Sequence, residues 1–150
     1  MSLIADPGFS NGGPGWRPLN GGDAVVFGQQ NDAEIARSGD GWFAYGRTRR
    51  PAGSVALDLD LTQVSQSLQI DSLTAVAWVR ARPGRADVSG TMALWNLQQA
   101  ATSHGARFVA SQSWQFVSVM LPRGGKSRFR VEFYIETVDE DLLIDSVNVF

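Results

Sequence analysis

Residues 129–136 read Phe-Arg-Val-Glu-Phe-Tyr-Ile-Glu, a strict alternation of apolar and polar side chains. A β-strand points successive side chains to opposite faces, whereas a helix would repeat its apolar positions about every 3.6 residues. The period of two therefore predicts a strand whose face with Phe129, Val131, Phe133 and Ile135 is buried.

The same alternation recurs along the chain between turn-forming residues. It predicts further strands at residues 55–61, 73–81, 91–95, 117–121 and 142–150. In the last of these, alternation places Leu143, Asp145, Val147 and Val149 on one face. Residues 62–68 fit either a short helix or a loop, and the Gly- and Pro-rich first third predicts loops with short strands.

About eight short strands with Gly and Pro turns predict an all-β protein. The expected architecture is a two-sheet antiparallel β-sandwich of jelly-roll topology. At 150 residues and 43% hydrophobic content the chain can bury one core, so we expect a single domain over residues 1–150.

Composition argues against several classes of partner. A net charge of −2 does not attract nucleic acid, and no apolar run is long enough to cross a membrane. The first residues lack the basic and apolar regions of a signal peptide, so an export signal would lie outside this chain.

Five motifs in order resemble one group of proteins. They are Asp6-Pro7-Gly8-Phe9-Ser10-Asn11-Gly12 with Gly15-Trp16, Ser38-Gly39 with Gly46-Arg47-Thr48, Ala77-Trp78-Val79-Arg80, Phe133-Tyr134-Ile135-Glu136 and Leu143-Ile144-Asp145-Ser146-Val147. This order resembles carbohydrate-binding modules of families 4, 9 and 22, most of all the xylan-binding family 22, which have a galactose-binding-like jelly roll. The resemblance implies a polysaccharide or glycan bound on a concave sheet, a structural calcium ion elsewhere, and secretion within a larger protein, with a glycoside hydrolase as a linked partner.

The sequence departs from that pattern behind Thr48. Family 22 modules usually carry a binding-site Trp there, whereas Arg49, Arg50 and Pro51 follow here. The alternative hypothesis is therefore a structural or protein–protein interaction jelly roll that has lost sugar binding.

Sugar binding needs exposed aromatic rings beside planar hydrogen-bonding groups. The polar faces of the predicted strands supply a ligand-binding set of Trp78, Arg80, Trp95, Tyr134, Glu136 and Arg47. If the strands share one sheet, the aromatic members line one groove. Two alternatives stay open, because Trp78 and Trp95 could instead cover sheet surface, and Arg47 could pair with the protein's own Asp58 and Asp60.

Asp145 is the candidate metal ligand. Its apolar neighbours predict burial, and a buried carboxylate needs a cation or several N–H donors. One solution is calcium, held with main-chain oxygens near Asp6 and Ser10, and the other is the backbone N–H groups of residues 6–8. Ser10 and Ser146 stand where the family usually has carboxylates, which lowers the ligand count. The acids at 139–141 predict a solvated turn, with calcium as the alternative.

No catalytic set stands out, so we expect no enzyme. The chain has no Cys, and its single His, His104, falls in a stretch that reads as a loop. Glu132 and Glu136 would lie about 13 Å apart along one strand, which is too far for the carboxylate pair of a glycosidase.

Overall fold

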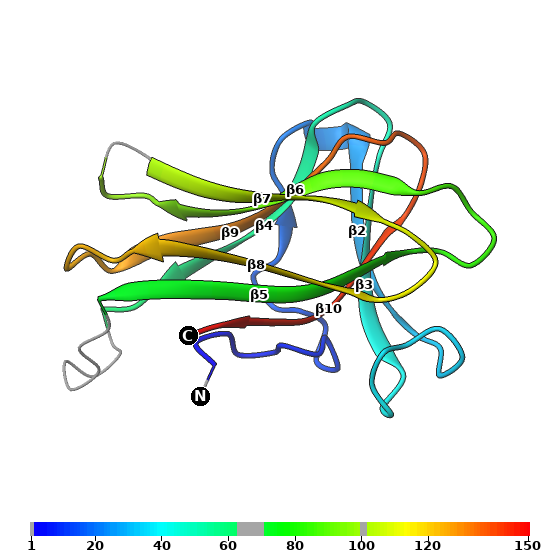
Figure 1. The fold of residues 1–150 in the computed structure, drawn as a ribbon, viewed down its shortest axis with the longest axis horizontal. Helices are drawn as coiled ribbons and strands as arrows, with labels where there is room; N and C mark the ends of the chain where they lie inside the picture. Colours follow the sequence, from blue (N-terminus) through cyan, green and yellow to red (C-terminus); the bar gives the residue numbers. More distant parts are fainter. Residues whose placement is uncertain (1, 63–70, 100–101) are drawn as a thin grey trace.

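The computed structural model describes residues 2–62, 71–99 and 102–150 (Figure 1). The strands in these ranges are β1 (Arg17–Pro18), β2 (Val25–Asn31), β3 (Trp42–Thr48), β4 (Gly53–Asp60), β5 (Ser72–Ala81), β6 (Val88–Asn96), β7 (Thr102–Ala110), β8 (Gln115–Pro122), β9 (Arg128–Ile135) and β10 (Leu142–Val149). A 3-10 turn, η1, spans Gly22–Ala24. None of the described helices is long and apolar enough to cross a membrane.

The strands form two antiparallel five-stranded sheets, which confirms the predicted β-sandwich. Sheet A has the order β1-β4-β9-β6-β7, and sheet B has the order β2-β3-β10-β5-β8. In Figure 1 the strands β4, β6, β7 and β9 lie above β5, β8 and β10. Each sheet therefore has an inner side facing its partner and an outward side.

The core lies between the sheets and is built from the alternating apolar residues. The inward positions of β9, from Phe129 to Ile135, are fully buried, as are those of β5 from Leu73 to Ala81. The inward side chains of β4 and β8 belong to the same hydrophobic cluster. The apolar faces of these four strands therefore line one core.

The last strand differs from its predicted alternation. Its register against β5 shifts between Asp145 and Asn148, and Ser146 has a φ of 52°. Such a bulge adds one residue to the strand, so the side chains after it point to the faces opposite to those that strict alternation predicts. Leu142 and Ile144 consequently face the core before the bulge and Val147 faces it afterwards, while Asp145 points away from it.

Two further expectations need correction. The described residues hold ten strands rather than about eight, because the Gly-rich first third contributes three and β7 adds one that the sequence did not indicate. His104 lies inside β7 rather than in a loop, and its Nδ1 is 2.8 Å from the main-chain oxygen of Met120. Of the segment 62–68, residues 63–68 lie outside the described residues.

Candidate functional site

The outward side of sheet A brings two predicted aromatic residues together. Trp95 on β6 lies opposite Arg130 of β9, and Tyr134 of β9 lies opposite Thr91 of β6. Both rings are partly exposed. One row of residues separates them along the strands.

That separating row is made mostly of small side chains. Glu132 of β9 pairs with Ala93 of β6, which pairs in turn with Gly105 of β7. Ala93 is only 4% exposed and Trp95 Nε1 lies buried near the Tyr134 hydroxyl, so the two rings close over this row. We call this row, which crosses the strands between Trp95 and Tyr134, the trough.

A buried carboxylate lies under one side of this trough. Glu132 is only 2% exposed, and both of its oxygens accept hydrogen bonds. Tyr134 Oη donates to Oε1 at 2.8 Å, and Ser54 Oγ donates to Oε2 at 2.5 Å. Burial, and then Glu132, raise the pKa of Tyr134 to about 12, so its hydroxyl keeps its proton at neutral pH.

Trp95 offers a hydrogen-bond donor that has no acceptor. Its Nε1 is buried and has no hydrogen-bond partner among the described residues. It nevertheless lies near enough to the Tyr134 hydroxyl to lower the pKa of Tyr134, against the larger effect of burial. The Tyr134 oxygen is therefore the acceptor adjacent to this nitrogen, and the buried N–H is not open to a ligand.

The charged side chains around the trough neutralise one another. Arg130 donates to both oxygens of Asp58, at 2.7 and 3.2 Å, and this contact lowers the pKa of Asp58. Arg17 adds a third contact to Asp58 at 3.3 Å. Toward the other end, Arg107 and Glu136 lie 3.6 Å apart with side chains 80% and 45% exposed. Glu136 thus remains accessible beside the site.

Trp78 and Arg80 lie on the opposite face of the molecule. They belong to β5 of sheet B, so the condition for a single groove with Trp95 and Tyr134 is not met. The Arg37 guanidinium lies 4.3 Å from the centre of the Trp78 ring, and Phe116 packs edge-on at 5.5 Å. A sugar could stack on that side of Trp78 only after displacing Arg37.

Arg47 also lies away from the trough, on β3 of sheet B. Its ion-pair partner is Asp141, at 3.6 Å, and not Asp58 or Asp60 as the sequence suggested. Asp141 also pairs with Arg82 at 2.5 Å, and Arg85 binds Glu140 at 2.9 Å. These groups line a polar pocket of about 310 Å³. The acids at 140 and 141 are therefore ion-paired rather than simply solvated, and they stand beside arginines that would repel a metal ion.

Asp145 is buried as the sequence predicted. Its Oδ1 accepts the N–H of Ser146 at 2.7 Å, whereas its Oδ2 is buried with no hydrogen-bond partner in the described ranges. The donor is thus not an N–H of residues 6–8. Burial raises the pKa of Asp145 to about 6, and the charge of Asp40 adds to this effect.

The orphaned Oδ2 of Asp145 is the type of oxygen that calcium binds, and the charge of Arg37 lies near it. Pro7 lies alongside, because its main-chain oxygen accepts the N–H of Val147 at 3.0 Å. The Asp6 carboxylate is occupied by its own loop, accepting the N–H groups of Asn11 and Gly13. No group of three metal-binding side chains occurs in the described part of the chain, so main-chain oxygens would complete the coordination.

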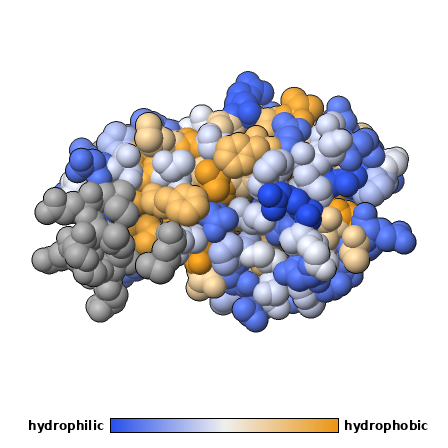
Figure 2. Space-filling model, turned by 60° about the horizontal axis from the view of Figure 1, so that its bottom comes forward, coloured by the Kyte–Doolittle hydropathy of each residue, from blue (hydrophilic) through white to orange (hydrophobic). Residues whose placement is uncertain are grey.

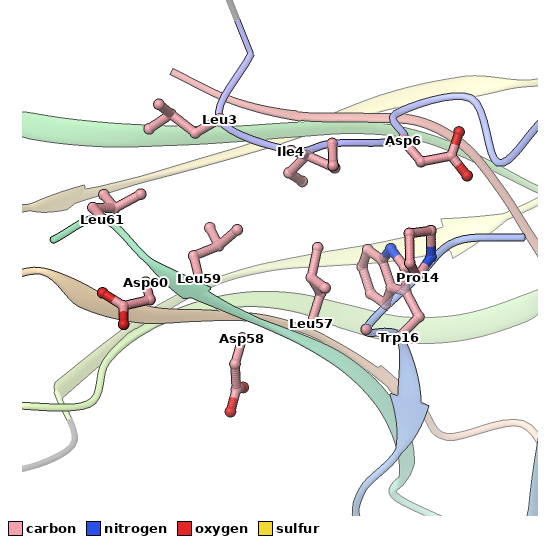
Figure 3. A pocket seen from close by; sticks show the side chains of 12 residues that line it. Leu3, Ile4, Asp6, Pro14, Trp16, Leu57, Asp58, Leu59, Asp60 and Leu61 are labelled. Atoms are coloured by element: carbon pink, nitrogen blue, oxygen red, sulfur yellow. The ribbon is translucent and has the colours of Figure 1, made fainter. Parts of the chain in front are cut away.

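A different pocket, of about 290 Å³, opens between the N-terminal segment and β4 (Figure 3). Leu57 and Leu59 point toward Ile4, while Asp58 points away from the pocket. The lining is an apolar slot at the edge of the sandwich. It lacks the convergent polar groups that orient a sugar.

The outward side of sheet B carries exposed apolar side chains. Phe116 and Met120 of β8 are 54% and 60% exposed. Figure 2, which turns the underside of Figure 1 forward, shows an apolar band across this part of the surface. This apolar surface on sheet B contrasts with the outward side of sheet A, where the charged side chains form ion pairs with one another.

Comparisons with known proteins identify the fold. No family model matches the sequence, and no curated protein matches it. Among solved structures, a family 61 carbohydrate-binding module in complex with β-1,4-galactotriose is similar over 100% of this chain and 98% of its own, with 15% identity and a TM-score of 0.71. The family 22 xylan-binding domain of Paenibacillus barcinonensis is similar over 99% and 89%, with 16% identity and a TM-score of 0.66.

A third structure contains a module joined to a catalytic one. The CBM22-1 and GH10 modules of a Clostridium thermocellum xylanase, complexed with xylohexaose, match 96% of this chain and 27% of their own, at 12% identity and a TM-score of 0.62. The chain therefore has the fold of carbohydrate-binding modules.

Proposed function

We propose that this protein is a non-catalytic carbohydrate-binding module that holds a glycan on the outward side of sheet A. The observation that carries the proposal is the pair of partly exposed aromatic residues, Trp95 and Tyr134, on the outward side of one sheet. The shared fold supports it, since similar structures are a xylan-binding domain and a module in complex with β-1,4-galactotriose.

The trough would bind sugar by stacking and by hydrogen bonding. The partly exposed rings of Trp95 and Tyr134 offer apolar faces for the C–H side of a pyranose ring. The exposed carboxylate of Glu136 offers an acceptor for hydroxyl groups. These groups come from two adjacent strands, so a ligand chain would run across the sheet.

Calcium belongs to the same proposal as a structural ion. Asp145 would be its carboxylate ligand, with main-chain oxygens of the N-terminal segment near Asp6 and Ser10. The ion would neutralise the buried charge and tie that segment to β10, where Val147 already binds Pro7. It would take no part in sugar binding, because Asp145 belongs to sheet B.

The wider context is that of a module in a secreted protein, in which it would bring a linked glycoside hydrolase to its substrate. The xylanase whose CBM22-1 module is joined to GH10 supports this arrangement.

A protein–protein interaction domain is the second candidate. The exposed Phe116 and Met120 on one face of β8 favour it, because solvent-exposed apolar surface often marks a contact surface. In this case the trough would bind no glycan.

Affinity electrophoresis distinguishes the two functions. Migration of the protein is measured in gels with and without xylan or β-1,4-galactan, and a glycan array extends the search. Retardation by either polysaccharide supports the module. If no glycan binds the protein and light scattering shows concentration-dependent self-association, the protein is an interaction domain and not a carbohydrate-binding module.

A further inference from the structure

We infer that the glycan site continues from Tyr134 to a shallow pocket at the β7 edge of sheet A, where Arg107 and Glu136 hold a hydroxyl of a second sugar unit between them. This inference rests on the proposed function and adds to it a second subsite and the chemical group that this subsite recognises. The pocket has a volume of about 280 Å³ and is lined by Ser89, Arg107, Phe108 and Val109.

A ligand reaches this pocket directly from solvent. The side chain of Arg107 is 80% exposed, and Val109 is 55% exposed. Ser89, which lies opposite Val109 on β6, is partly exposed as well. Because β7 is the outermost strand of sheet A, no further strand of this sheet flanks the pocket in the described part of the chain. The pocket is therefore open where the buried row between Trp95 and Tyr134 is closed.

The register of sheet A aligns the pocket with Tyr134. Tyr134 of β9 lies opposite Thr91 of β6, and Thr91 lies opposite Arg107 of β7. Two strand spacings, together about 9.6 Å, therefore separate the backbone at Tyr134 from the backbone at Arg107. A glycan that stacks one ring on Tyr134 thus reaches the pocket with a following ring.

The turn after β9 holds Glu136 beside the same pocket. The N–H of Glu136 donates to the main-chain oxygen of Ser89, and the N–H of Ser89 donates to Thr137 Oγ1, both at 2.9 Å. The Glu136 carboxylate lies 3.6 Å from the Arg107 guanidinium, and its side chain is 45% exposed. These contacts fix the backbone of the turn and leave the carboxylate accessible to a ligand.

The Arg107–Glu136 pair suits a hydroxyl group as its ligand. Its separation of 3.6 Å is longer than a hydrogen bond, and an exposed ion pair of this kind contributes little stability that a ligand would have to replace. A guanidinium can only donate hydrogen bonds, and an ionised carboxylate can only accept them. A sugar hydroxyl satisfies both groups, because it accepts from Arg107 and donates to Glu136. The exposed Val109 beside them offers an apolar surface for the C–H groups of the same ring.

Two arginine variants test the direction in which the site extends. Isothermal titration calorimetry measures Kd for xylohexaose and for the β-1,4-linked galactose hexasaccharide. We expect Arg107→Ala to weaken binding of whichever hexasaccharide the wild type binds by about tenfold. Thermal unfolding should show the wild-type Tm, because the Arg107 side chain is 80% exposed.

Arg128→Ala is the matched control. Arg128 is also an exposed arginine on the outward side of sheet A, but it lies at the other end of β9, opposite Asp60. Its removal should leave Kd unchanged. If Arg128→Ala weakens binding and Arg107→Ala does not, the glycan extends in the opposite direction and the inference is wrong. It is also wrong if neither variant changes Kd.

A charge swap separates recognition of the ligand from an effect on the local structure. Arg107→Glu leaves two carboxylates and no guanidinium donor, so it should weaken hexasaccharide binding by about tenfold or more. Adding Glu136→Arg restores one donor and one acceptor at exchanged positions, and we expect Kd to return to within about threefold of the wild-type value. A double variant that binds as weakly as Arg107→Glu alone overturns the inference.

Failure of the proposed function gives a different result. In that case the wild type itself binds neither hexasaccharide and no polysaccharide retards it in affinity electrophoresis. Failure of the inference alone leaves wild-type binding intact, with Kd unaffected by Arg107→Ala.

Discussion

Replacing Trp95 by alanine should remove sugar binding with little loss of stability. The ring is partly exposed on the outward side of sheet A, so its truncation leaves no large cavity in the core. Loss of a stacking ring is worth about 1 to 3 kcal/mol, which corresponds to about 5- to 150-fold weaker binding. An accompanying stability loss of about 1 kcal/mol would lower Tm by only about 2–4 °C.

Trp78→Ala is the matched control on the opposite face. The edge-on contact with Phe116 is worth about 0.5–1.5 kcal/mol, and the contact with Arg37 is worth about 0.5–1 kcal/mol. Together these predict a loss of about 1–2.5 kcal/mol, which lowers Tm by about 2–10 °C. Glycan affinity should stay at the wild-type value.

The assay combines affinity electrophoresis on xylan and β-1,4-galactan with thermal unfolding of the same samples. We expect the two variants to differ in opposite ways: Trp95→Ala loses retention by the polysaccharide, whereas Trp78→Ala loses thermal stability. If Trp78→Ala loses retention while Trp95→Ala keeps it, the glycan binds on sheet B and the assignment of the trough is refuted.

Three further changes have defined outcomes. Millimolar calcium should raise Tm and a chelator should lower it, because an ion bound only by the native state adds stability; no shift with either would remove the calcium proposal. Tyr134→Phe should abolish an ultraviolet titration step at about pH 12, and a step that persists in the variant would contradict this. Because the pKa of Tyr134 is raised in the folded state, the stability that its hydroxyl contributes is lost as pH rises from 10 toward 12. Gly90→Ala should lower the free energy of unfolding by about 1–3 kcal/mol in a denaturant titration, since its Cβ would lie 2.3 Å from the main-chain oxygen of Tyr134. If the variant is as stable as the wild type, β9 can shift away from the new Cβ without loss of stability, and the prediction is wrong.

The sequence predicted the sandwich because its central strands follow a regular period. In β9 and β5 every second residue is apolar and buried, so the pattern alone identifies both the strand and its inner face. Among their pairing partners, β8 buries alternate residues in the same way, whereas β4 and β10 bury residues on both faces. A hydrophobic core lined by every second residue of its strands is compatible with few architectures other than a sandwich.

The bulge in β10 could not be read from the sequence in the same way. A left-handed backbone is usually marked by Gly or Asn, but here Ser146 adopts it at a φ of 52°. Without that marker the alternation appeared to continue, and Val147 was assigned to the face of Asp145. Only the shifted register against β5 reveals that the two point to opposite sides.

The candidate site was predictable residue by residue but not as an assembly. Alternation correctly set Trp95, Tyr134 and Glu136 on polar faces, yet it contains no information about which strands are neighbours. The antiparallel order β9-β6 joins two of these residues, while β5 in the other sheet separates Trp78 from them. Glu132 had a detectable signal, since it shares the polar face of Tyr134, whereas Ser54 lies on another strand and had none.

The difference between Trp78 and Trp95 finally depends on a segment with no periodic pattern. The loop before β3 is fastened onto sheet B, where Trp114 Nε1 donates to Ile35 O at 2.9 Å and Arg37 donates to Ser146 Oγ at 3.1 Å. This attachment places the guanidinium over Trp78. Trp95 carries no such cover among the described residues, and its N–H remains without a partner. Both tryptophans alternate with apolar neighbours in the same manner, so a distant loop, and not the strand that carries the ring, determines which of them a ligand can reach.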